Sequence, residues 1–497
     1  MQTIALKSGD IKSLQHLREI AKTCVYVQVA AAFIYFLSSL AYPTSNTVAV
    51  TCGVLAIMAS LTPVYYAMYT KHFQSLFSCV SAFSLAPIWF LYLEAVTPGY
   101  DAYEYIQPLY RMEACFWVAI FLVCTNAFYL LFWKAGTRYS VRYFSFLSRL
   151  QIRSSLYTRL TVLSFLVPMA GFYFFFGSGA KVWTYLTAGR SERGQELIEQ
   201  LVGGAGAFMN PLIWLLQLAP LFGAIAFVSA KKQNSFWPVV SLVVGLLVIF
   251  IFFLSGSRGT MMFVAAPVLF FFFYYNWHKG LKFWIPASIM LFMLIGVMEM
   301  QVRFRGNLLD VIVNPEKAAK ENDLKSATTF DPSKSHRDNN TYLLCLLIKG
   351  YPDKYEYEGF NNFFATVVNP IPRALWPGKP VMDGAQDLSY QPAFILDGPL
   401  FMGTTSLTFS VVGDAYRSKG IIGILCYGAV YALFLIFFDG IVFYTREKQA
   451  LAAGMLGVGV FLSFWGFRSF FALMSFIYPI VLLLVTIRIV QMLRIIK

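Results

Sequence analysis

The chain has 497 residues, of which 58% are hydrophobic, 18% aromatic and only 13% charged. A soluble domain of this length could not bury so much apolar surface in one core, so the composition excludes a soluble globular protein. The net charge of +14 suggests nucleic acid, but in a membrane protein the location of the basic residues matters more than their sum. The composition therefore predicts a polytopic membrane protein.

Residues 1–22 precede the first long apolar run and carry several basic side chains. Behind Asp10, a residue that favours a helix start, apolar residues recur at three-residue intervals: Ile11, Leu14, Leu17 and Ile20. This pattern predicts a short basic helix lying on the anionic inner leaflet of a membrane. The alternative is a solvated leader.

Apolar runs of the length that a helix needs to cross hydrocarbon recur from residue 23 to the end of the chain. They predict about twelve transmembrane helices, at 23–41, 47–69, 74–95, 113–133, 158–178, 211–229, 237–254, 260–276, 282–301, 420–438, 450–467 and 474–493. The predicted fold class is an all-α polytopic integral membrane protein. In this arrangement 23–301 holds helices one to nine, 302–419 is one large loop, and 420–497 holds the last three helices and the C-terminus.

The charge pattern predicts the orientation of these spans. With the N-terminus in the cytoplasm, the inner segments hold about half of the 39 basic residues. The same segments hold only four acids, which are Asp10, Glu19, Asp439 and Glu447. Both termini are therefore expected in the cytoplasm, with 302–419 on the outer side.

Residues 369–380 form the most unusual part of that outer loop. Four prolines in this stretch forbid a helix and deny most of its backbone a sheet ladder, so we expect a rigid turn. The turn carries Arg373, Lys379 and Trp376. Two cations and an aromatic ring above a bilayer suit an anionic, lipid-borne ligand with sugar attached.

Four further arginines lie at predicted outer ends of spans, against the usual preference for basic residues inside. Arg258 lies in the turn Ser-Gly-Ser-Arg-Gly, where small residues and helix-start amides favour anion binding. Arg303 and Arg305 follow the ninth span, and Arg468 ends the eleventh. Their alternatives are a snorkelling arginine for Arg258 and pairing with Glu299 for the two after the ninth span.

Two other segments of the outer loop carry reactive side chains. In 335–342, His336 and Asp338 are alternative general bases, beside the cation Arg337 and the amide of Asn339. In 413–420, which leads into the tenth span, Asp414 and Arg417 either pair with each other or face a substrate. The structural alternatives for the first segment are a solvated histidine and an Asp338–Arg337 pair.

The absence of familiar motifs narrows the chemistry. No phosphate-binding Gly-Lys-Ser/Thr loop, dinucleotide fingerprint or His-Glu-x-x-His zinc helix is present in the sequence. No cofactor and no metal are therefore expected, and the energy for any transfer should arrive in an activated substrate.

The sequence of 371–380 is Ile-Pro-Arg-Ala-Leu-Trp-Pro-Gly-Lys-Pro, and a Gly-Asp-Ala-Tyr segment follows at 413–416, with Gly420 and Gly423. These motifs resemble those of the oligosaccharide repeat unit polymerases, the Wzy-type O-antigen polymerases. The resemblance implies a membrane-embedded glycosyltransferase of the C type (GT-C) with a periplasmic active site in the bacterial inner membrane. Such enzymes transfer a growing glycan from undecaprenyl pyrophosphate to a new lipid-linked repeat unit.

Under this resemblance, three residues become candidate bases: His336, Asp338 and Asp414. Pyrophosphate is a good leaving group when positioned cations meet its charge, and the expected cations are Arg258, Arg303, Arg305, Arg337, Arg373, Lys379, Arg417 and Arg468. The expected sugar contacts are Trp376, Tyr416 and Asn339. The implied partners are donor and acceptor lipid-linked oligosaccharides, membrane lipids, a Wzz-type chain-length regulator and a flippase, with no nucleic acid.

Two other functions compete with this one. The run from His336 is also similar to the histidine-containing loop of O-antigen ligases, which transfer the same donor to lipid A core. A polysaccharide transporter or flippase is the alternative outside the enzymes. Transporters usually bury charges in mid-membrane and contain paired repeats, whereas here the charges gather at one rim.

Overall fold

The computed structural model describes residues 8–96, 106–145, 154–188, 206–230, 235–255, 258–276, 340–368, 376, 378–380, 409–442 and 450–470, with isolated positions at 285, 289, 296, 371, 473–474, 477–478, 480–481 and 484. Within these residues every regular element is a helix. The predicted all-α class is thus confirmed for the described part of the chain.

The helices follow one another along the chain with short turns between most neighbours. In order they are α1 (Ser8–Ala41), α2 (Asn46–Ser60), α3 (Thr62–Thr70), η1 (Phe73–Phe77), α4 (Cys79–Pro87), η2 (Ile88–Tyr92), α5 (Leu93–Val96), α6 (Pro108–Tyr143), α8 (Ser154–Phe176), α9 (Gly179–Ala188), α11 (Gly206–Val228), α12 (Phe236–Leu254), α13 (Arg258–Asn276), α18 (Asn340–Gly350), α19 (Asn361–Val368), α21 (Ser410–Asp439), α23 (Ala450–Trp465) and η6 (Gly466–Arg468).

Nine stretches of the described chain are helical, long and apolar enough to cross a membrane. They are Leu14–Ala41, Asn46–Thr70, Cys79–Val96, Pro108–Tyr143, Ser155–Phe176, Pro211–Val228, Phe236–Leu254, Ser410–Asp439 and Ala450–Arg468. The chain is therefore a multi-pass membrane protein. Each stretch coincides with an expected span.

The other three expected spans have different outcomes. The span expected at 260–276 is helical as α13, but its apolar part, Gly259–Tyr274, is shorter than the nine. The spans expected at 282–301 and 474–493 lie almost entirely outside the described residues. A total of twelve spans therefore stays a prediction.

The segment before the first span differs from its prediction. From Ser8 onward it forms the start of one long helix, α1, which continues unbroken to Ala41. Leu17 and Ile20 are buried against the rest of the protein. The three-residue apolar spacing thus reflects packing of one long helix on its neighbours, which a sequence pattern cannot distinguish from packing on lipid.

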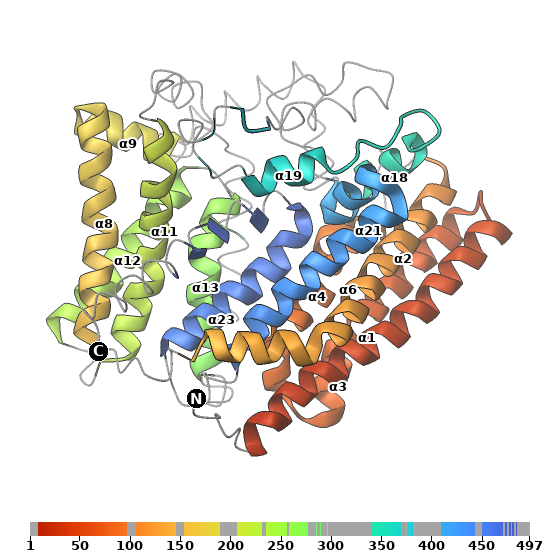
Figure 1. Cartoon of the computed structure of the whole chain (residues 1–497), viewed down its shortest axis with the longest axis horizontal. Coiled ribbons are helices and arrows are strands. Elements are labelled where there is room, and N and C mark those ends of the chain that lie inside the picture. The colour runs from red at the N-terminus through yellow and green to blue at the C-terminus, as the bar shows by residue number, and fades with distance from the viewer. Residues whose placement is uncertain are drawn as a thin grey trace.

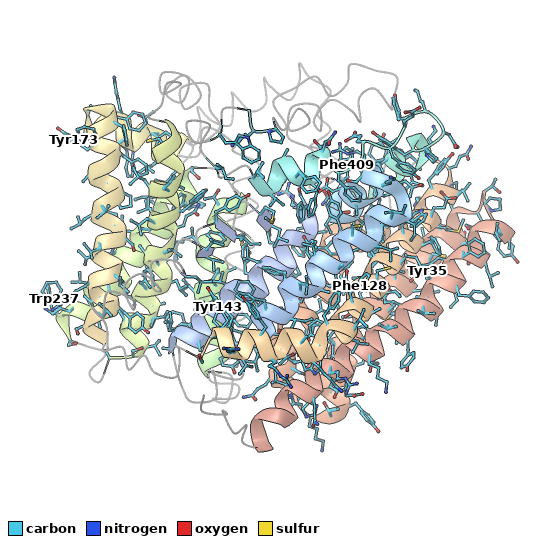
Figure 2. The ribbon with its side chains drawn as sticks, viewed as in Figure 1. Tyr35, Phe128, Tyr143, Tyr173, Trp237 and Phe409 are labelled. Atoms are coloured by element: carbon cyan, nitrogen blue, oxygen red, sulfur yellow. The ribbon has the colours of Figure 1, made fainter. Side chains whose placement is uncertain are left out.

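The helices form two groups joined by a central pair (Figure 1). On one side α6 packs between α1 and α21, and on the other α8, α11 and α12 pack on one another. Helices α13 and α23 connect the groups. Figure 2 shows Tyr173 and Trp237 on the margin, where they are largely exposed, whereas Tyr35 and Phe409 are buried. An apolar periphery of this kind suits contact with lipid.

Helix α18 lies within the segment predicted as one long outer loop, yet ten of its eleven residues are buried. The Glu94 carboxylate accepts hydrogen bonds from the backbone N–H groups of Thr341 (3.1 Å) and Tyr342 (3.0 Å). A carboxylate at a helix start satisfies N–H groups that have no partner within the helix. Through this capping and its apolar surface, α18 packs within the helix bundle.

Helix α21 links the two ends of the bundle. Its backbone is not helical at Lys419 and Gly420, so the helix has a sharp kink at these two residues. The part after the kink, 420–439, is about 30 Å long, which matches the hydrocarbon thickness of a bilayer.

Asp439 ends this helix and is 1% exposed. Its carboxylate accepts hydrogen bonds from the backbone N–H groups of Cys79 (2.6 Å) and Val80 (3.2 Å) and from the Tyr129 hydroxyl (2.9 Å). These four residues, the Asp439 cluster, cap the start of α4. The cluster therefore joins α4, α6 and α21 at the end of the bundle opposite the kink.

Candidate functional site

The candidate site is built on the kink in α21. Gly420 has a φ of 56°, in the left-handed region that glycine adopts at little cost. Gly423 lies so close to the Ala415 carbonyl oxygen that a Cβ there would overlap it. The two glycines thus let the chain turn back on itself and hold 410–418 tightly against the start of the span.

The short segment before α19 caps this turned helix. The backbone N–H of Glu358 donates to the Arg417 carbonyl oxygen (3.2 Å), and the N–H of Gly359 donates to that of Ser418 (2.8 Å). Carbonyl groups in the last turn of a helix have no partner within it, so these two bonds satisfy groups that the kink leaves open. They also fix the position of Glu358 relative to Arg417.

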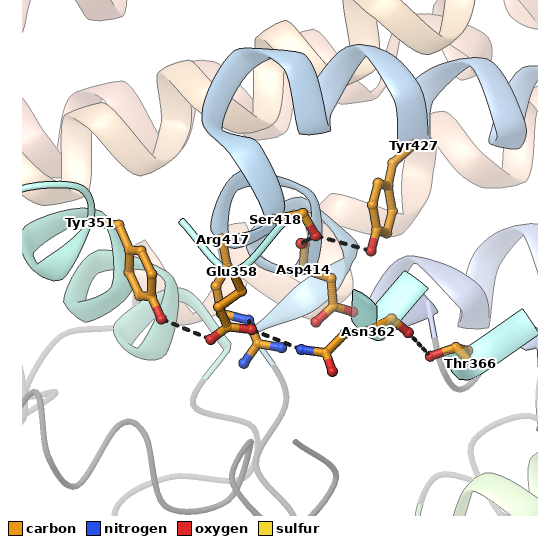
Figure 3. A network of polar contacts seen from close by, with 8 residues as sticks. All are labelled: Tyr351, Glu358, Asn362, Thr366, Asp414, Arg417, Ser418 and Tyr427. Carbon is orange, nitrogen blue, oxygen red and sulfur yellow. Dashed lines mark hydrogen bonds and ion pairs between the residues drawn. The ribbon is translucent and has the colours of Figure 1, made fainter. Parts of the chain in front are cut away.

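The Glu358 side chain then forms an ion pair with Arg417, whose Nε lies 3.1 Å from Glu358 Oε2. Tyr351 donates its hydroxyl hydrogen to Oε1 (2.9 Å), and Asn362 donates through Nδ2 to Oε2 (2.8 Å). The side chain of Arg417 is 4% exposed and that of Glu358 21%. Figure 3 shows these contacts converging on the carboxylate. Charge-assisted hydrogen bonds of this kind are stronger than neutral ones.

The Tyr351 hydroxyl is held in its neutral form. Burial raises the pKa of this phenol above its ordinary value, and the nearby Glu358 carboxylate raises it further. At neutral pH the hydroxyl therefore keeps its proton and donates a hydrogen bond to the carboxylate. The carboxylate is in this way surrounded by donors from three different segments of the chain.

Asp414 extends the site toward the end of α23. Its Oδ2 accepts hydrogen bonds from the backbone N–H of Phe470 (3.0 Å) and from Ser469 Oγ (3.4 Å). These residues directly follow Arg468, whose guanidinium lies 5.7 Å from the centre of the Trp465 ring. Two of the predicted cations, Arg417 and Arg468, are thus brought to the same end of the bundle.

An aromatic layer supports these polar groups. The rings of Phe363 and Phe470 stack at 4.9 Å, and Tyr427 packs edge-on against both of them. The Tyr427 hydroxyl lies 3.3 Å from Ser418 Oγ. The layer connects α19, α21 and the residues after η6, so the polar groups above it are held on a packed base. We name Tyr351, Glu358, Asn362, Asp414, Arg417, Ser418 and Tyr427 the Glu358–Arg417 network.

Arg258 begins α13 at this same end of the bundle. Phe263 contacts Phe461 (5.9 Å), while Phe270, further along α13, contacts Phe77 near the Asp439 cluster (5.3 Å). The start of α13 therefore lies at the end where η6 and Arg468 lie. Only the backbone of Arg258 is described.

The predicted sugar contacts differ in their surroundings. Trp376 is 41% exposed, so its ring can meet a ligand. Tyr416 is 6% exposed; its ring packs 5.0 Å from that of Trp117, and its hydroxyl donates to the Tyr351 carbonyl oxygen (3.3 Å). Tyr416 therefore packs inside the protein instead of offering a surface.

Part of the proline-rich stretch is described and includes a predicted cation. The backbone N–H of Lys379 donates to the Trp376 carbonyl oxygen (3.2 Å), and its Nζ donates to the Ile371 carbonyl oxygen (2.9 Å). These bonds close the stretch into a turn at its described positions. Lys379 thus has a structural contact within the turn in addition to its predicted role.

The remaining predicted site residues lie outside the described residues, and their roles stay predictions: His336, Asp338, Asn339, Arg303, Arg305, Arg337 and Arg373. In the part of the chain that the structure does describe, no three His, Cys, Asp or Glu side chains gather as a metal site would require. The expectation of a metal-independent reaction likewise stays a prediction.

Five members of the network were not among the candidates from the sequence: Tyr351, Glu358, Asn362, Ser418 and Tyr427. Glu358 lies in the run Tyr-Pro-Asp-Lys-Tyr-Glu-Tyr-Glu-Gly at 351–359, where tyrosines alternate with charged residues. That density of aromatic and acidic side chains is unusual for a solvated loop and could have drawn attention. The pairing with Arg417 could not be read from it, because the two residues lie far apart in the sequence.

These features define a multi-pass helical membrane protein with a nearly buried, carboxylate-held arginine at one end of its bundle. No protein-family model matches the chain. Neither a curated protein sequence nor a solved structure matches it.

Proposed function

We propose that this protein is a polymerase of lipid-linked oligosaccharide repeat units, of the Wzy type that the motifs at 371–380 and 413–423 resemble. It transfers the growing glycan from undecaprenyl pyrophosphate to the non-reducing end of a new lipid-linked repeat unit. The product is O-antigen or a related surface polysaccharide. The protein would be a GT-C-like enzyme of about twelve spans, acting at the periplasmic face of the bacterial inner membrane.

One observation carries most of the proposal. Asp414, Arg417 and Arg468, selected from sequence as ligand-binding or catalytic, gather at one end of the bundle through the contact between Asp414 and the residues after Arg468. Arginines on the outer side of a span run against the usual preference for basic residues inside, which suggests that they have a partner or a ligand. A lipid diphosphate is an anion that would reach this end from the membrane.

The proposed chemistry needs a cation and a base. The acceptor hydroxyl oxygen attacks the anomeric carbon of the donor sugar, and the bond between that carbon and the diphosphate oxygen breaks with its electron pair going to the diphosphate. Arginines near that oxygen stabilise the charge as it develops. The hydroxyl proton passes to a base, for which His336, Asp338 and Asp414 are the alternatives.

Arg417 is nearly buried and already paired with Glu358, so the proposed role requires the diphosphate to enter beside that ion pair. A guanidinium in a site with little water attracts an anion more strongly than one on the surface, because fewer water dipoles oppose the attraction. Arginine also binds phosphate oxygens in a fixed planar geometry that lysine does not match. Trp376, exposed on the turn that follows α19 in the chain, would stack on a sugar ring of the substrate.

Gene deletion separates the proposed function from its alternatives. Loss of a polymerase leaves single repeat units on the surface lipid, whereas loss of a ligase leaves no repeat units there and loss of a flippase leaves them on the cytoplasmic side. Arg373→Ala is expected to reproduce the deletion with normal amounts of folded protein in the membrane. Normal-length glycan from that variant would show that Arg373 is not needed for the transfer. Full-length glycan in the deletion strain would refute the proposal that the protein is a polymerase.

A further inference from the structure

Glu358 is held in place more firmly than a loop residue usually is. Its own N–H is bonded to the Arg417 carbonyl, and its carboxylate is bonded to Tyr351, Asn362 and Arg417. The donors come from the end of α18, from α19 and from the turned part of α21. Movement of any one of these elements would therefore have to break a bond to this carboxylate.

Arg417 depends on Glu358 for its orientation. Arginine side chains have several rotatable bonds and lose considerable entropy when they are fixed, so a preformed partner lowers the cost of holding one for a ligand. Glu358 contacts the guanidinium at Nε, on the edge next to the side-chain stem. The Arg417 guanidinium also lies over the Phe409 ring, 5.7 Å from its centre. Arg417 is thus held by a carboxylate and an aromatic ring.

We infer that Glu358 is a positioning residue of the transfer reaction, which orients the Arg417 guanidinium toward the diphosphate of the lipid-linked donor. The inference rests on the proposed function. We assign Glu358 no contact with the substrate and no part in the proton transfer. Its effect on the rate passes through Arg417, because that is the charged group it holds.

This inference predicts coupling between the two residues. Extension of a defined undecaprenyl-pyrophosphate-linked repeat unit would be measured for wild type, Glu358→Gln, Arg417→Gln and the double variant, at equal amounts of folded protein. We expect kcat to fall about 10-fold or more for Glu358→Gln and further for Arg417→Gln, with the double variant no slower than Arg417→Gln alone. Residues that act as one unit give such non-additive losses.

Glu356→Gln is the matched control, since Glu356 is an exposed acid two positions away in the same segment. It makes the same chemical change without touching Arg417, and we expect the wild-type rate from it. If Glu358→Gln folds poorly, Tyr351→Phe removes only one donor to the carboxylate and should give a smaller loss that also disappears in the Arg417→Gln background.

Three results bear on the inference in different ways. A wild-type rate for Glu358→Gln, or losses that multiply in the double variant, would overturn the positioning role. The activity of the wild-type protein would in that case still support the polymerase. A purely structural Glu358 would lower the folded yield and leave kcat per folded molecule unchanged, which also overturns it. Absence of extension by folded wild-type protein would instead count against the proposed function, and with it the inference.

Discussion

The two ends of α21 each hold a carboxylate, and they hold it differently. Asp439 is fully enclosed and accepts hydrogen bonds from two backbone N–H groups and a tyrosine hydroxyl, all of them neutral donors. Glu358, at the other end, is partly exposed and forms an ion pair with a side-chain cation. Backbone amides are fixed by the helix that carries them, whereas a guanidinium must be oriented by its partner. Under the proposed function, this difference predicts that the Asp439 cluster serves stability and that the Glu358–Arg417 network serves activity.

The largest effect is expected for activity at the network. Arg417→Gln should lower the rate of glycan extension by at least about 100-fold, since loss of one group that stabilises developing charge costs about that much. It also leaves the Glu358 carboxylate without its cation, so a lower melting temperature is expected as well. Extension assays on purified protein, corrected for folded fraction, measure the first effect apart from the second. A rate within twofold of wild type would contradict the comparison at this end.

The Asp439 cluster should respond in the opposite way. Asp439→Asn removes the charge while keeping the shape, and it weakens hydrogen bonds to the starting N–H groups of α4. We expect a loss of about 2 to 3 kcal/mol in the free energy of unfolding, because bonds to a buried charge are worth more than neutral ones. Thermal unfolding in detergent measures it.

The rate of glycan extension per folded molecule of Asp439→Asn is the second measurement on this variant. It should match wild type, since the cluster lies about 30 Å from the network, the length of a membrane-spanning helix. If Asp439→Asn keeps the wild-type melting temperature but loses activity, the assignment of stability to the Asp439 cluster and of activity to the Glu358–Arg417 network is wrong.

The kink should be sensitive to one methyl group. Gly423→Ala places a Cβ against the Ala415 carbonyl oxygen, so the turned part of α21 must move. We expect a destabilisation of about 1 to 3 kcal/mol and slower extension, because Glu358 and Arg417 are bonded across this part of the helix.

Gly428→Ala is the control in the same helix. Its Cβ would lie 3.3 Å from both Cys124 Cβ and Thr125 Oγ1, a tight contact that small shifts can relieve. Its loss of stability should be the smaller of the two, and its activity should remain. Equal effects of both substitutions on extension would mean that the kink has no special link to the site.

The smallest effect is expected for Tyr351→Phe. This change removes one hydrogen bond to the Glu358 carboxylate and keeps the ring. A loss of about 1 to 2 kcal/mol is expected for a bond to a partly exposed carboxylate, and 1 kcal/mol corresponds to about a fivefold slower reaction if it acts on the transition state. A melting curve and a rate measured on the same sample show how the loss divides between folding and activity.

The membrane spans were the most predictable part of the fold. The expected spans 211–229 and 237–254 agree closely with Pro211–Val228 and Phe236–Leu254. A run of apolar residues long enough to cross a bilayer is a local property, so the sequence carries it directly. The burial of α18 could not be predicted in this way, because eleven residues within a polar segment are too few for a span and are covered only in the folded bundle.

The site was predictable only in part, for a related reason. Asp414 and Arg417 stood out as charged residues beside the start of a span, which is a local feature. Glu358 matters because of Arg417, and Asp414 because of the residues that follow Arg468, and both contacts depend on how distant segments meet. Tyr416, expected as a sugar contact from the resemblance, is buried against Trp117, a packing partner that no spacing rule could have indicated.

Purified protein supplied with a defined undecaprenyl-pyrophosphate-linked repeat unit tests the central claim most directly. The account predicts a ladder of carrier-linked products, each longer than the last by one repeat unit, made by wild type and strongly reduced in Arg417→Gln. If folded wild-type protein leaves the repeat unit unchanged, or if Arg417→Gln makes the same ladder at the same rate, the account is contradicted.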